Sequence, residues 1–102
     1  MAELHIACTD EVPEGTGLVV DVGDKRLAVF RYGGEFFVLD ETCPHRGGPL
    51  HEGLIREGVV VCPWHLWQFD LRTGVSPVNP LSKVKAYRTR VVDGEVLVEM
   101  DE

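Results

Sequence analysis

Hydrophobic and polar residues alternate in short stretches along most of the chain. Strand-like stretches lie at Glu3–Cys8, Leu18–Val22, Lys25–Arg31, Phe36–Leu39, Val59–Val61, Trp67–Leu71, Lys83–Val91 and Glu95–Met100. A period of two residues is typical of β-strands that bury one face. Gly23-Asp24, Tyr32-Gly33-Gly34-Glu35 and Asp93-Gly94 separate such stretches and predict hairpin turns.

No stretch shows the pattern of an amphipathic helix of three turns. The sequence therefore predicts an all-β fold, a small antiparallel barrel or sandwich. With 102 residues, the chain is long enough for one domain, residues 1–102, and too short for two. Two irregular stretches interrupt the strands, Thr42–Gly58 and Ser76–Ser82, and long loops in a compact domain are usually functional.

Charge and hydropathy exclude two classes of partner. The formal net charge is −7, which argues against nucleic acid and anionic membranes because both attract a basic surface. No apolar run approaches the roughly 20 residues of a membrane-spanning helix. The start, Met1 to His5, has neither the basic nor the apolar region of a signal peptide, so we expect a cytoplasmic protein.

Three cysteines, Cys8, Cys43 and Cys62, are too few and odd in number for a disulfide framework. Cys8 lies in an alternating stretch and is predicted to be a small buried apolar residue. The other two each precede a histidine, in Cys43-Pro44-His45 and in Cys62-Pro63-Trp64-His65.

Two metal centres use such ligands. A structural zinc ion binds two cysteines and two histidines in a tetrahedron. A 2Fe–2S cluster can instead take two thiolates on one iron and two imidazoles on the other. In zinc fingers one half supplies both cysteines and a helix supplies both histidines, whereas here each half supplies one of each on loops of an all-β domain. This arrangement favours the cluster and leaves zinc as the alternative.

The segments Cys43–Leu50 and Cys62–Gly74 closely resemble the Rieske iron–sulfur family. The resemblance implies that Cys43 and Cys62 hold the inner iron, and that His45 and His65 hold the outer iron. It implies a β-sandwich or barrel base that carries a small cluster-binding subdomain of two loops, about residues 42–75. The stretch Ser76–Leu81 resembles the proline-containing loop that covers the cluster in this family.

The chain departs from the Rieske proteins of respiratory and photosynthetic complexes at four positions. Gly48 and Trp64 stand where those proteins have a disulfide between the two loops. Trp67 and Phe69 stand where they have a serine and a tyrosine that donate hydrogen bonds to the cluster and a ligand sulfur. Fewer such hydrogen bonds stabilise the reduced cluster less, so we expect a low potential within the Rieske range.

These departures resemble the ferredoxin components of aromatic-ring dioxygenases. The implied function is a one-electron carrier between a flavin reductase and a terminal oxygenase. The small subunit of an assimilatory NAD(P)H nitrite reductase is one alternative, and a zinc-stabilised interaction module is another. No nucleophile with its base is recognisable, so we expect an electron-transfer component without a substrate site of its own. His51 is predicted to be exposed and His5 to lie on an edge strand, neither of them a ligand.

Overall fold

A computed structural model of the chain describes residues 2–41, 49–63, 67–79 and 81–100. The strands within these ranges are β1 (Ala2–Cys8), β2 (Gly17–Val22), β3 (Lys25–Tyr32), β4 (Glu35–Asp40), β5 (Leu54–Arg56), β6 (Val59–Val61), β7 (Gln68–Asp70), β8 (Ala86–Tyr87), β9 (Thr89–Val92) and β10 (Glu95–Met100). Two short 3₁₀ turns accompany them, η1 (Thr9–Glu11) and η2 (Leu50–Glu52). No helix in the described ranges is long and apolar enough to cross a bilayer.

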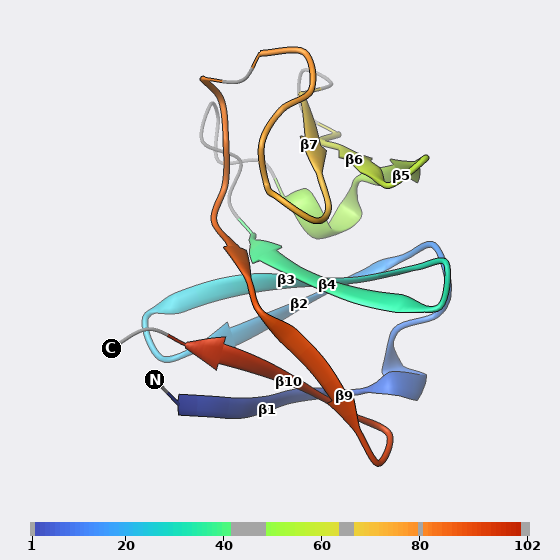
Figure 1. Cartoon of the computed structure of the whole chain (residues 1–102), viewed down its shortest axis with the longest axis vertical. Coiled ribbons are helices and arrows are strands. Elements are labelled where there is room, and N and C mark those ends of the chain that lie inside the picture. The colour runs from blue at the N-terminus through green and yellow to red at the C-terminus, as the bar shows by residue number, and fades with distance from the viewer. Residues whose placement is uncertain (1, 42–48, 64–66, 80, 101–102) are drawn as a thin grey trace.

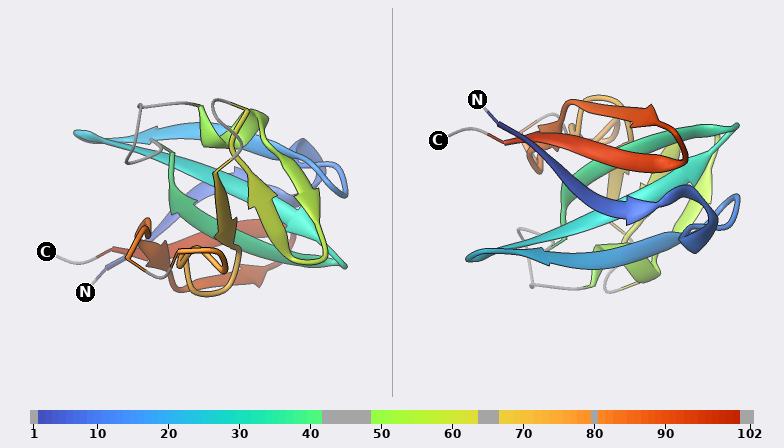
Figure 2. Two further views of the ribbon diagram at one scale, coloured as in Figure 1. Left: turned by 90° about the horizontal axis from the view of Figure 1, so that it is seen from above. Right: turned by 90° about the horizontal axis from the view of Figure 1, so that it is seen from below.

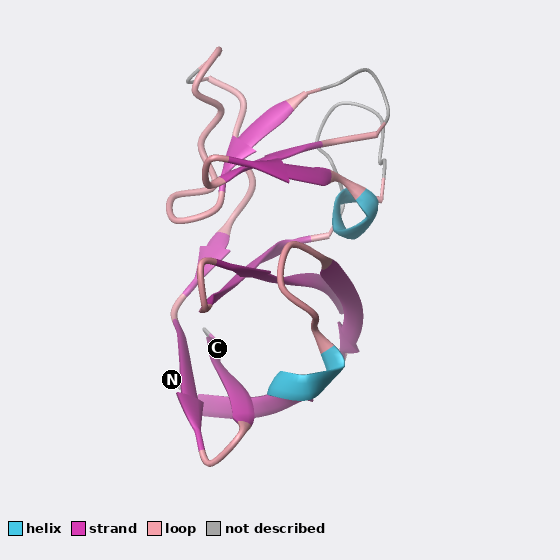
Figure 3. Cartoon of the chain, turned by 90° about the vertical axis from the view of Figure 1, so that its right-hand side faces the viewer, coloured by secondary structure: helices cyan, strands magenta, loops and turns pink. Residues whose placement is uncertain are grey.

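Within the described ranges, the strand pairs are antiparallel and form three sheets, with the orders β1-β10-β9, β2-β3-β4-β8 and β5-β6-β7. Figure 1 shows the sheet of β5, β6 and β7 at one end of the molecule and β1, β9 and β10 at the other, with β2, β3 and β4 between them. Seen from below, the sheet of β1, β9 and β10 lies across the sheet that contains β2, β3 and β4 (Figure 2). In side view the two lower sheets curve around a common interior (Figure 3). The predicted all-β class, with a barrel-like base, is confirmed.

The middle sheet is buried on both faces. Leu27 and Val29 of β3 join one core inside the barrel, which also contains Val96 and Val98 of β10. Their neighbours Ala28 and Phe30 point the other way, into a second core; we call it the junction core. All four β3 residues from Leu27 to Phe30 have no exposed surface. A strand that is covered on both sides needs a continuous apolar run rather than alternation.

The junction core connects the barrel to the small sheet. Its fully or nearly fully buried members come from six places in the chain, and they are Ala28, Phe30, Leu39, Leu50, Val60, Cys62, Phe69, Leu71 and Val84. Leu50 of η2 is among them, so this short turn lies at the joint between the two parts. The small sheet thus has no separate interior, since its inward residues pack on the outer face of β3 and β4.

The predicted hairpin turns are confirmed. Gly33 and Gly34 connect β3 to β4 with φ of +63° and +80°, values that side chains with a Cβ rarely adopt. The Glu14 carboxylate accepts hydrogen bonds from the Gly33 amide at 2.5 Å and from the Gly34 amide at 3.1 Å. These donors, the Gly33 amide first, hold the pKa of Glu14 below its ordinary value.

Two boundary predictions are wrong. The stretch Lys83–Val91 is not one strand: it makes a single bridge at Lys83, then forms β8, which pairs with β4, and β9, which pairs with β10. The chain passes from one sheet to another between β8 and β9. The alternation of apolar and polar residues does not indicate where a segment changes the strand with which it pairs. The stretch Thr42–Gly58 is not wholly irregular either, because β5 lies within it and pairs with β6.

The prediction that Cys8 is a buried residue is also wrong, because Cys8 is half-buried and Ala7 is the buried residue, with 3% of its surface exposed. The pairing of β1 with β10 shifts between His5 and Ala7, which leaves Ile6 as an extra residue. Such a β-bulge reverses which residues face the core. Partial burial and then the nearby Glu11 carboxylate raise the pKa of the Cys8 thiol, which favours its neutral form.

Candidate metal centre

Cys62 is the one predicted ligand that lies within the described residues, whereas Cys43, His45 and His65 lie outside them. Cys62 follows directly after β6 and has no exposed surface. Its side chain belongs to the junction core. A thiol in this place can serve as a ligand on the side of a metal group that faces away from water, which is the role that the resemblance implies for it.

The ends of both predicted ligand loops meet at the junction core. The first cluster loop, residues 42–48, begins after Glu41, the residue that follows β4, and the chain returns at Pro49 and Leu50. The second cluster loop, residues 63–66, leaves at Cys62 and returns at Trp67. Leu50 and Cys62 are buried in the same core, and Trp67 packs against it. The two loops therefore start from one place in the fold, as ligands of a shared metal group require.

Backbone hydrogen bonds close each loop at its base. The Leu50 amide donates to the Glu41 carbonyl at 3.0 Å, and the Cys62 amide donates to the Trp67 carbonyl at 2.6 Å. Closed loops lose less conformational freedom when a metal group binds between them. The donor set of two thiolates and two imidazoles, on loops with fixed ends, fits a histidine-ligated 2Fe–2S cluster.

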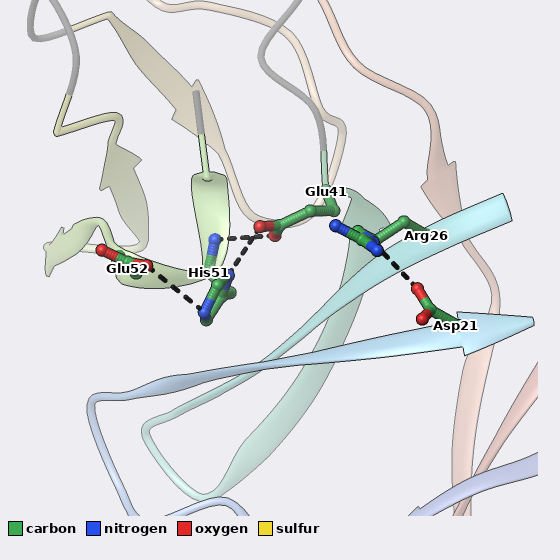
Figure 4. Close-up of polar contacts among 5 residues, drawn as sticks. All are labelled: Asp21, Arg26, Glu41, His51 and Glu52. Carbon is green, nitrogen blue, oxygen red and sulfur yellow. Dashed lines mark hydrogen bonds and ion pairs between the residues drawn. The ribbon is translucent and has the colours of Figure 1, made fainter. Parts of the chain in front are cut away.

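A buried carboxylate lies at the base of the first cluster loop (Figure 4). Glu41 has 4% of its surface exposed, and its side chain points toward His51 of η2. Glu41 Oε1 accepts from the His51 amide at 2.9 Å, and Oε2 lies 2.6 Å from His51 Nδ1. The prediction that His51 is exposed is wrong, because only 23% of its side chain is accessible.

The sequence interpretation missed Glu41 and His51. The sequence places an acidic residue before the glycine-rich loop and a histidine after it, but this order alone does not indicate a contact between them. His5, by contrast, lies on β1, an edge strand of its sheet, as predicted.

The strand that leads into the first cluster loop is anchored next to Glu41. Asp40, the last residue of β4, accepts a hydrogen bond from the Tyr87 hydroxyl at 2.7 Å. The Asp40 amide donates to the Lys85 carbonyl at 3.0 Å. The segment before β8 thereby fixes the end of β4, and with it the point at which the loop begins.

The stretch predicted to cover the cluster forms a loop at the same end of the molecule as β7 (Figure 1). Ser76, with 1% of its surface exposed, closes this loop: its amide donates to the Ser82 carbonyl, and its hydroxyl accepts from the amides of Val78 and Asn79. Leu81 is 91% exposed. Whether this loop covers the cluster stays a prediction.

The two positions at which the sequence lacks hydroxyl groups lie close to the candidate centre. Phe69 of β7 is fully buried in the junction core, and Trp67 packs against that core. The Phe69 side chain offers the centre no hydrogen-bond donor.

Comparisons with known proteins agree with this description. A family model described as the Rieske [2Fe-2S] domain matches residues 3–88. The chain is 37% identical over 102 residues to the anthranilate 1,2-dioxygenase ferredoxin subunit of Burkholderia cepacia, covering 98% of this chain and 94% of the relative.

Two solved structures show the same fold. One is a chain of the complex of reduced oxygenase and oxidized ferredoxin in carbazole 1,9a-dioxygenase, with a TM-score of 0.84, 32% identity, and coverage of 94% of this chain and 91% of that one. The other is described as an NADH-dependent nitrite reductase small subunit from Mycobacterium tuberculosis, with a TM-score of 0.86, 25% identity, and coverage of 95% and 93%. The matches favour the iron–sulfur cluster over the zinc alternative. The chain belongs to the Rieske [2Fe–2S] domain family, and it is an electron carrier whose cofactor is a Rieske-type 2Fe–2S cluster.

Proposed function

We propose that Cys43, His45, Cys62 and His65 are the four ligands of this cluster, in a single Rieske domain of residues 1–102. The two thiolates hold the inner iron and the two imidazoles hold the outer iron. The observation that carries the proposal is the burial of Cys62 in the core that also holds the base of the other loop. When bound, the cluster takes up one electron and gives it up again.

The residues around Cys62 exclude water from the inner side of the centre. Leu50, Phe69 and Leu71 belong to the same core, and each has at most 2% of its surface exposed. A hydrophobic shell, without the serine and tyrosine hydroxyls that Trp67 and Phe69 replace, disfavours the added negative charge of the reduced state. A potential at the low end of the Rieske range, roughly −150 to +300 mV, is therefore expected.

We infer that the carrier passes electrons from a flavin reductase to a terminal oxygenase. The similarity to the ferredoxin subunit of anthranilate 1,2-dioxygenase supports this role, as does the similarity to a chain of an oxygenase–ferredoxin complex. A net charge of −7 suits brief docking on a basic surface of a larger partner. The cytoplasm is the proposed location, and no substrate site of its own is expected.

The nitrite reductase small subunit is the second candidate. A fold match at 25% identity supports it, whereas the dioxygenase ferredoxin subunit matches at 37% over nearly the whole chain. A direct test is the rate at which the reduced protein is re-oxidised. A dioxygenase terminal component, supplied with its aromatic substrate and oxygen, should accept the electron. Transfer only to the large subunit of a nitrite reductase would reverse the order of the two candidates.

The ligand assignment is tested by spectroscopy on protein purified without oxygen. The wild type should contain two irons and two sulfides, and reduction with dithionite should give the rhombic EPR signal of a histidine-ligated cluster. Cys62→Ser should lose this signal, while the matched variant Cys8→Ser should keep it. A Cys62→Ser variant with the wild-type spectrum, or a colourless wild type that binds one zinc ion, would overturn the proposal.

A further inference from the structure

The base of the first cluster loop is closed by side chains as well as by backbone. Glu41 stands at one end of the loop and His51 just beyond the other, ten residues apart. Glu41 Oε1 binds the His51 amide at 2.9 Å, while Oε2 lies 2.6 Å from the ring nitrogen Nδ1. Figure 4 shows the carboxylate turned across the loop base toward η2.

The backbone of Glu41 is held as firmly as its side chain. The Glu41 amide donates to the Arg26 carbonyl of β3 at 2.9 Å, and its carbonyl accepts from the Leu50 amide at 3.0 Å. One residue thus connects the middle sheet, the start of the loop and the return of the chain. Its contacts give a fixed separation between the two ends of residues 42–48.

A buried carboxylate at this place calls for an explanation. Moving such a group out of water is unfavourable unless hydrogen bonds compensate, and an apolar side chain could fill the same space without that cost. Unlike an apolar side chain, a carboxylate fixes the orientation of its partner, because its two oxygens bind two donors of the same residue at defined angles. A fixed orientation of the two ends is needed in a loop that must hold metal ligands in place.

Another histidine–carboxylate pair, away from the loop base, offers a comparison. His5 Nε2 and Glu95 Oε1 are 3.4 Å apart, but both side chains are about half exposed, at 47% and 49%. They connect β1 and β10 in the lower part of the barrel. Exposed pairs of this kind contribute little, so the same residue types serve there as a matched control.

We propose that Glu41 and His51 form a clasp that holds the first cluster loop closed, and so sets how tightly the chain retains its cluster. Glu41 and His51 act as positioning residues through Cys43 and His45, and touch neither iron nor sulfide. The inference rests on the proposed ligand set and adds the residues that hold its first half in place.

The test compares how fast the cluster is lost. Holoprotein is purified without oxygen and mixed with an excess of EDTA, and the decay of the visible absorbance is followed. Glu41→Ala should lose the cluster at least about tenfold faster than the wild type, the size of effect typical for partners of metal ligands. His51→Ala should show a smaller acceleration, because the backbone amide of residue 51 still donates to Glu41.

The conservative variant Glu41→Gln provides the rescue. Its amide oxygen can accept from the residue 51 amide, and its NH₂ group can donate to Nδ1 of the other imidazole tautomer. We expect retention close to that of the wild type and an unchanged EPR spectrum. The control Glu95→Ala should also release its cluster at the wild-type rate.

Global destabilisation is separated from the clasp by the thermal unfolding of each variant, followed by far-ultraviolet circular dichroism. If Glu41→Ala loses its cluster at the wild-type rate, the clasp is overturned. It is also overturned if the rate of cluster loss depends only on the unfolding temperature in every variant. Leu50→Ala, a change in the core, is included in this comparison. A wild-type protein that binds no cluster would overturn both the ligand proposal and the clasp. If the wild type binds its cluster stably and the Glu41 and His51 variants lose theirs at the same rate, only the clasp is overturned.

Discussion

Truncation of Leu50 should test most directly how the cluster-binding end is joined to the barrel. Leu50 has no exposed surface, and it lies in the junction core. Leu50→Ala removes three carbon atoms, worth about 2.4 kcal/mol at about 0.8 kcal/mol each. The cavity left behind adds to this loss, and buried leucine-to-alanine changes cost about 2–5 kcal/mol. We therefore expect the free energy of unfolding to fall by about 3 kcal/mol.

For a domain of this size, that loss corresponds to a decrease of about 15 °C in the unfolding temperature. Leu50→Ala, its control Leu54→Ala and the wild type should be heated as holoprotein at one scan rate, because cluster loss makes unfolding irreversible. Far-ultraviolet circular dichroism reports the fold, and visible absorbance reports the cluster in the same sample. The control is Leu54→Ala, the same change at a side chain that is 73% exposed, expected to shift the temperature by less than about 3 °C. A shift below about 5 °C for Leu50→Ala, or equal shifts for both variants, would refute the role assigned to the junction core.

Further changes probe the potential, the backbone and the charge of the surface. Phe69→Tyr places a hydroxyl at the candidate centre and should raise the potential in an EPR-monitored redox titration; an unchanged or lower value would contradict the argument from missing donors. Gly74→Ala should lower the unfolding temperature more than Gly58→Ala, since both have φ near +78° but only at Gly74 would the new Cβ collide with the Val84 carbonyl. Glu14→Gln should be less stable than the wild type at neutral pH, because the pKa of the Glu14 carboxyl is lowered in the folded protein. Such a carboxyl stabilises the folded state at a pH above its ordinary pKa, and this stabilisation is lost as the pH falls through the lowered pKa. Urea unfolding at pH 7 and pH 3 checks this, and a difference that grows toward low pH would contradict it.

Alternation predicted most strands because most of them bury one face, as in Glu3–Cys8 and Glu95–Met100. It could not predict that β3 serves two cores, since a continuous apolar run such as Leu27–Phe30 also fits a strand buried in a single layer. It missed β5 because a three-residue strand between Gly53 and the turn at Gly58 is too short to show a period.

The ligand motif could be recognised because thiolate and imidazole at fixed spacing are rare outside metal sites. The partners that hold the motif were not recognisable in the same way. Glu41 and His51 form their contact only after the middle sheet and η2 have been placed, and nothing in an isolated acidic residue distinguishes a buried carboxylate from an exposed one. For the same reason His51 was predicted on the surface.

The sharing of β3 and β4 between two cores has a consequence for how this domain can be cut or recombined. Removing the insertion that carries the cluster would not leave a smaller complete barrel, because the outer face of the middle sheet, with Ala28, Phe30 and Leu39, would be left bare. An apolar surface of that kind favours aggregation. The cluster-binding end cannot be transferred alone to another scaffold either, since the apolar residues on which it packs belong to the barrel strands β3 and β4. Fusions and inherited rearrangements should therefore join this domain to others at its termini and leave the interior of the chain intact.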